Sequence, residues 1–158
     1  MVKRLDQKSP RQVSPSAGNL APAIRAASQA MVAAKMARLR AAGFEGVTPA
    51  IASLVPLLRA EGVRPTMLAQ RSGVTKQAMT QLVRELEARG YVERTPDPVD
   101  ARGSILRLTP AGIALSQACA GALRALEDTA VAALGREGLD RLQHDLAQLT
   151  TALEPPKS

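Results

Sequence analysis

Apolar residues recur at helical spacing along most of this chain. Residues 19–43 have apolar positions three and four apart, which predicts a first helix with Asn19 as its N-cap. Thr48 followed by a proline predicts a second helix that opens with an N-cap and ends by Gly62. Pro56 lies inside this second helix, so we expect it to kink or shorten the helix.

Two further short helices are predicted close together. The first begins at Pro65 and ends at Gly73, a residue type suited to the left-handed conformation that terminates helices. Thr75 then caps a new helix that runs to Gly90. One face of this helix is apolar, with Met79, Leu82, Val83 and Leu86 at helical spacing. Two short helices joined by a turn that contains glycine form a helix-turn-helix pattern.

The pattern changes from helical to extended after Gly90. Residues 91–94 and 104–108 read as strands, and the loop between them contains two prolines and a glycine. The sequence therefore predicts a hairpin directly behind the second short helix, which is the position of the wing in a winged helix.

A long helix is predicted from Thr109 and Pro110 to Leu134. We expect Gly135 and Gly138 to interrupt it before a final helix. That final helix has a seam of leucines at alternating spacings of three and four, namely Leu139, Leu142, Leu146, Leu149 and Leu153.

The segment of residues 68–112 resembles the winged helix of MarR-type regulators. The resemblance rests on three motifs in order: the glycine-containing turn before Thr75, the exit LEARGYVER, and Asp100-Ala101-Arg102 followed by Leu108-Thr109. It implies a mainly α fold with a small β-hairpin wing. We expect a single domain over residues 19–154, with the winged helix-turn-helix in residues 48–110. Residues 19–43 and 110–154 would be dimerisation helices, and residues 1–18 a disordered basic arm.

Composition and charge restrict the partners. The chain has 158 residues and 46% hydrophobic content, enough for one substantial core, and only 1% aromatics, so that core must be aliphatic. The net charge of +7 favours an anionic partner, either nucleic acid or a membrane surface. No apolar run approaches the roughly 18 residues of a membrane span. The single cysteine excludes an intramolecular disulfide and fits a reducing compartment, so we expect a cytoplasmic protein.

The polar face of the second short helix is the candidate DNA-reading surface. Long side chains there can reach base edges and phosphates in the major groove. An ordinary solvated face is the alternative, but the first turn holds a lysine where the helix dipole favours an acid, and no acid precedes Glu85. The candidate DNA-binding residues on this helix are Thr75, Lys76, Gln77, Thr80, Gln81 and Arg84.

The wing adds two candidates. The resemblance implies that Asp100 braces the wing and that Arg102 enters the minor groove, where a narrow groove attracts arginine. A simple surface ion pair between the two is the alternative interpretation.

A homodimer is predicted, because one recognition helix reads too few base pairs and a dimer matches two half-sites. The candidate dimerisation residues are Leu20 and Ile24 of the first helix and Leu139, Leu142, Leu146, Leu149 and Leu153 of the last. The leucine seam could instead belong to the core of a monomer. The resemblance implies double-stranded DNA and a second copy of the chain as partners, with repression of a pseudo-palindromic operator and a small-molecule effector of unidentified chemistry.

Catalytic chemistry has little support in the sequence. His144 is the sole histidine and lies far along the chain from Cys119, and the sequence has no phosphate-binding glycine loop and no metal-ligand cluster. We expect no enzyme, no metal and no cofactor. Cys119 is predicted to be a buried packing residue, with a redox-sensing thiol as the alternative. A winged helix that binds another protein remains the alternative function.

Overall fold

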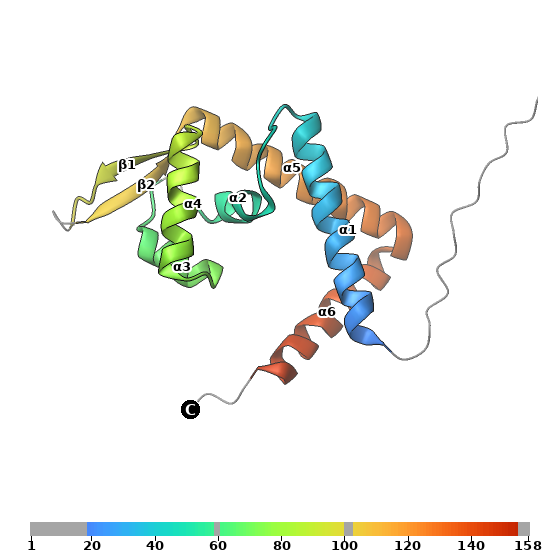
Figure 1. Cartoon of the computed structure of the whole chain (residues 1–158). Coiled ribbons are helices and arrows are strands. Elements are labelled where there is room, and N and C mark those ends of the chain that lie inside the picture. The colour runs from blue at the N-terminus through green and yellow to red at the C-terminus, as the bar shows by residue number, and fades with distance from the viewer. Residues whose placement is uncertain (1–18, 59–60, 100–102, 155–158) are drawn as a thin grey trace, which may run out of the picture.

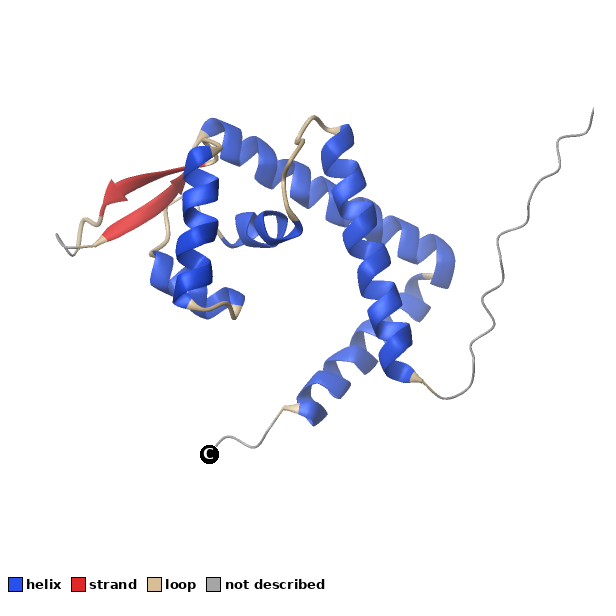
Figure 2. Ribbon diagram, viewed as in Figure 1, coloured by secondary structure: helices blue, strands red, loops and turns tan. Residues whose placement is uncertain are grey.

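The computed structural model describes residues 19–58, 61–99 and 103–154. Figures 1 and 2 show a mainly helical chain in which one long helix, residues 110–134, joins two groups of elements. One group is a small lobe that contains the short helices and the hairpin, and the other is a helical arm made of the helices at residues 20–41 and 136–153. The elements in chain order are α1 (Leu20–Ala41), α2 (Pro49–Leu54), η1 (Val55–Leu57), α3 (Pro65–Ser72), α4 (Lys76–Ala88), β1 (Val92–Pro96), β2 (Ser104–Leu108), α5 (Pro110–Leu134) and α6 (Arg136–Leu153). This confirms the predicted fold class.

Pro56 shortens the second helix, as predicted. Proline has no N–H, so it cannot donate to the carbonyl of Ala52 four residues earlier, and the chain tightens into the 3-10 turn η1. The freed Ala52 carbonyl accepts a hydrogen bond from Lys35 Nζ of α1 at 2.7 Å, and Cys119 Sγ of α5 lies 3.7 Å from it. One carbonyl therefore connects α1, α2 and α5 at the centre of the molecule.

The helix-turn-helix forms where the sequence predicts it. Gly73 ends α3 in the left-handed conformation with φ of 68°, and the hydroxyl oxygen of Thr75 caps α4 by accepting from the Ala78 N–H at 3.2 Å. Met79, Val83 and Leu86 are buried on the inner face of α4. This packing leaves the opposite face of α4 uncovered.

The predicted hairpin is present with slightly different ends. The antiparallel register pairs Val92 with Leu108 and Pro96 with Ser104, so β1 starts one residue later and ends two residues later than predicted. Val63 adds a short third member to the sheet by pairing with Leu106 through two backbone hydrogen bonds of 2.9 and 3.0 Å. The wing is therefore attached to the segment that precedes α3.

Of the expectations about helix ends, those for Gly135 and for the position of Asn19 are confirmed, and the one for Gly138 was wrong. Gly135 alone separates α5 from α6, with φ of 71° and ψ of 163°, a backbone conformation that side chains disfavour. Gly138 lies inside the first turn of α6 in an ordinary helical conformation and interrupts nothing. Asn19 occupies the N-cap position of α1, but its side chain makes no capping hydrogen bond.

Apolar residues remain exposed on the helical arm. Figure 1 shows α6 and the start of α1 away from the hairpin, beyond α5. The exposed apolar side chains there are Leu20, Ile24, Met31 and Val32 of α1 and Leu142, Leu146 and Leu153 of α6. Leu139 is instead buried within its own chain, and Leu149 is half-buried. Four of the five leucines of the predicted seam thus keep some accessible surface.

Candidate nucleic-acid interface

The outer face of α4 is polar and accessible. All six predicted DNA-binding residues on this helix are exposed, namely the N-cap Thr75 and Lys76, Gln77, Thr80, Gln81 and Arg84. The side chain of Thr80 donates a hydrogen bond to the Lys76 carbonyl at 2.9 Å, so its hydroxyl is directed at the helix backbone. The polar groups that extend into solvent are therefore those of Lys76, Gln77, Gln81 and Arg84.

Charge is separated along α4. Its two acids, Glu85 and Glu87, lie in the second half and are paired with Arg89 and Arg94, each at 3.0 Å. Lys76 and Arg84 form no ion pair within the part of the chain that the structure describes. The exposed face of α4 therefore offers uncompensated positive charge next to amide side chains, a combination suited to phosphates and base edges.

The two predicted wing residues, Asp100 and Arg102, lie outside the described residues. The structure does describe both sides of the loop that contains them. The N–H of Asp97 donates to the carbonyl of Gly103 at 3.2 Å, which closes the base of the loop.

Sequence reasoning missed Asp97 and Arg64. The Asp97 side chain is only 3% exposed, and among the described residues Asp97 is the one charged residue that is buried. One carboxylate oxygen accepts from Nε of Arg64, and the other accepts from the Val99 N–H at 2.9 Å. The local role of Asp97 could have been predicted, because an aspartate followed by proline in a turn segment is typical of an Asx turn. Nothing in the sequence indicates that Arg64 is the partner of Asp97.

Cys119 is buried, as predicted. Burial raises the pKa of its thiol, and the nearby Lys35 ammonium lowers that pKa by a smaller amount. The thiol therefore stays protonated at neutral pH and packs as a small apolar group. His144 lies on the exposed side of α6, where its ring nitrogen is 2.9 Å from Gln148. Within the described residues, no group of three metal-binding side chains comes together.

Known proteins are similar to this chain in its winged helix. A family model described as the MarR family matches residues 54–103. The multiple antibiotic resistance protein MarR of Salmonella typhimurium and that of Escherichia coli are each 35% identical over 57 residues, which cover 36% of this chain and 40% of each relative. The matched segment contains the helix-turn-helix and β1. In sequence, the winged helix of this chain is similar to that of the MarR family.

The MarR fold extends beyond that segment. The structure of a Staphylococcus aureus MepR–DNA complex superposes with a TM-score of 0.73 at 21% identity, covering 86% of this chain and 99% of the other. Streptococcus pneumoniae FabT in complex with DNA gives 0.75 at 20% identity, covering 86% and 96%. Reduced MarR of E. coli gives 0.69 at 23% identity, covering 84% and 96%. These similarities show that the flanking helices share the MarR architecture. Within the described residues, no helix has the length and apolarity needed to cross a bilayer.

Proposed function

We propose that this protein is a sequence-specific regulator of transcription that binds double-stranded DNA through α4 and the wing. One observation carries the proposal: α4 buries one face in the core and exposes Lys76, Gln77, Gln81 and Arg84 on the other, with no acid in its first half. Positive side chains near the N-terminus of a helix interact unfavourably with the helix dipole, so this charge does not serve helix stability and favours an anionic partner. The MepR and FabT neighbours were solved in complex with DNA, which supports the same partner here.

The roles of the α4 residues follow from their chemistry. Gln77 and Gln81 can each form a pair of hydrogen bonds with adenine in the major groove. Lys76 and Arg84 are suited to phosphates or, for Arg84, to guanine. Arg102 is proposed to enter the minor groove and Asp100 to brace the wing, as the family resemblance implies.

The working unit is proposed to be a homodimer. The exposed apolar residues of α1 and α6 lie at the end of the molecule away from α4, so a second copy can cover them and leave both winged helices free (Figure 1). Two recognition helices would then read half-sites about 34 Å apart on a pseudo-palindromic operator. We further propose a cytoplasmic, non-enzymatic repressor that a small-molecule effector releases from DNA.

Single substitutions on α4 separate base reading from phosphate binding. Gln77→Ala is expected to cost about 1 to 3 kcal/mol on the operator and almost nothing on random DNA, because it removes a base contact. Lys76→Ala is expected to weaken binding to both DNAs and to make the salt slope shallower by about one unit per altered contact. Arg102→Ala should fall between them, with its largest loss on A·T-rich flanks. Binding curves at two salt concentrations on two DNAs measure all three effects.

Arg124→Ala serves as the control, since it removes an equal charge from an exposed position on α5, outside the winged helix. It should leave the preference for the operator unchanged. If all three test variants bound both DNAs like the unaltered protein, the outer face of α4 would be an ordinary solvated surface. A winged helix that binds another protein would then be the better proposal.

A further inference from the structure

Besides the Val63 backbone pairing, an ion pair across the sheet joins the wing to the segment that precedes α3. Val63 pairs with β2, and β2 pairs with β1, so β2 lies between the segment before α3 and the strand that leads to Asp97. Arg64 follows Val63 directly and reaches the Asp97 carboxylate beyond the end of β1. The ion pair therefore spans the full width of the sheet and connects its two outer members.

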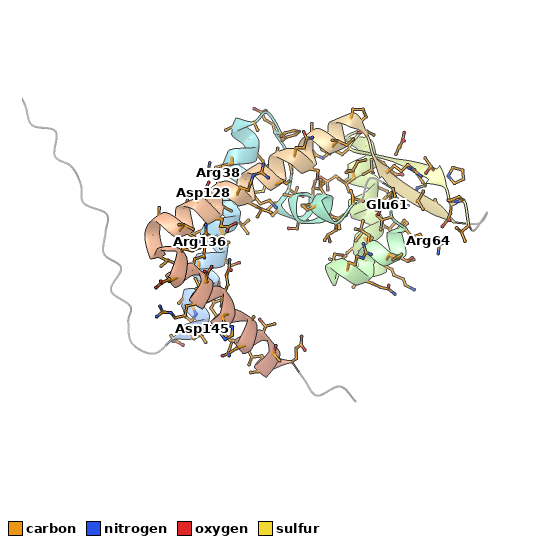
Figure 3. All side chains as sticks on the ribbon, turned by 180° about the vertical axis from the view of Figure 1, so that it is seen from behind. Arg38, Glu61, Arg64, Asp128, Arg136 and Asp145 are labelled. Atoms are coloured by element: carbon orange, nitrogen blue, oxygen red, sulfur yellow. The ribbon has the colours of Figure 1, made fainter. Side chains whose placement is uncertain are left out.

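The surroundings make this ion pair hard to open. The Asp97 side chain is buried, whereas the Arg64 side chain is 44% exposed. Glu61 and Arg64, both labelled in Figure 3, line the same hollow between α3 and the wing. Removing a cationic partner from a buried carboxylate is more costly than breaking a surface ion pair, because the carboxylate is poorly solvated. The Asp97 carboxylate also accepts a hydrogen bond from the Val99 N–H, and the Asp97 N–H donates to the Gly103 carbonyl across the base of the loop. Movement of the loop base would break all of these contacts together.

We propose that Asp97 and Arg64 are the positioning residues of the wing. They set the angle of the hairpin relative to α3 and α4, and so fix where the wing meets DNA beside the segment that α4 reads. Neither residue is assigned a contact with bases. This inference rests on the proposed DNA binding for its functional consequence, but its structural part can be measured without DNA.

The first measurement is amide hydrogen exchange of the free protein. Arg64→Met and Asp97→Asn should each raise exchange at the Asp97 and Val99 amides by about tenfold or more, because the loop base opens more often. The double variant should show a rise smaller than the sum of the two single rises, since both substitutions break the Arg64–Asp97 ion pair. Arg71→Gln is the control, because Arg71 lines the same hollow of about 310 Å³ between α3 and the wing and has no ion pair among the described residues. Unchanged exchange in Arg64→Met, or additive rises in the double variant, would overturn the proposal.

The second measurement uses two DNA duplexes, one with the operator and its flanks and one trimmed to the segment that α4 contacts. Asp97→Asn should weaken binding to the flanked duplex by about tenfold and leave the trimmed duplex unaffected. A general loss of stability would weaken both equally and would contradict the positioning role. If the unaltered protein bound neither duplex, the proposed function would fail, while the exchange measurement would still decide whether the ion pair holds the wing.

Discussion

Gly112→Ala is expected to destabilise the protein by about 3 kcal/mol or more, an effect large for a single methyl group. A Cβ at Gly112 would lie 1.9 Å from the Tyr91 carbonyl oxygen, 2.9 Å from its carbon and 3.0 Å from the Leu108 side chain. The Tyr91 backbone cannot move aside freely, because its carbonyl accepts from the Thr109 N–H at 3.1 Å and its N–H donates to Leu86 at 2.9 Å. Urea denaturation followed by circular dichroism measures the loss.

Gly121→Ala is the matched control in the same helix. The nearest atom to its added Cβ would be the far end of the Arg124 side chain at 3.9 Å, so the methyl group meets open space. Alanine is the better helix former, and this variant should gain about 0.5 to 1 kcal/mol. Equal stability of the two variants would mean that α5 does not begin as close to the end of α4 as the structure places it.

The second large effect is expected at the helical arm. Leu142→Lys combined with Leu146→Lys should convert the proposed dimer to a folded monomer at micromolar concentration, because two charges would have to be buried at a cost of several kcal/mol. In the single chain these leucines are 44% and 41% exposed, so the fold itself can accept lysine there. Leu149 is a poorer choice, since it is half-buried within its own chain. Sedimentation equilibrium measures the association.

Ile113→Lys is the control for that variant. Ile113 is also an exposed apolar residue, but it lies at the start of α5, at the opposite end of that helix from α6. This substitution should leave association unchanged. A monomeric unaltered protein, or a double variant that still dimerises with the same affinity, would remove the helical arm as the interface.

The sequence was informative wherever one residue decides the local backbone. Gly73 and Thr75 fix the end of α3 and the start of α4 because the left-handed conformation and the capping hydrogen bond are both local requirements. Pro56 ends α2 for the same kind of reason, a missing N–H. The polar face of α4 followed from periodicity alone, since its inner face has to be apolar.

The sequence was less informative where distant segments decide the outcome. Gly135 and Gly138 are equally able to break a helix, and the packing of α5 against α6 selects Gly135. The burial of Leu139 but not Leu142 likewise depends on how α6 folds back on α5. Asp97 and Arg64 are 33 residues apart and meet only because the sheet brings their segments together. No pattern along the chain encodes that ion pair.

The most direct test of the account is equilibrium binding of the unaltered protein to bulk duplex DNA as salt is raised. The exposed positive face of α4 predicts binding at low salt, with the logarithm of the affinity falling linearly as the logarithm of salt concentration rises. Between about 50 and 200 mM salt the affinity should fall by at least roughly tenfold, because each neutralised phosphate releases counterions. No binding at low salt, or an affinity that does not change with salt, would contradict the assignment of α4 as a DNA-reading helix.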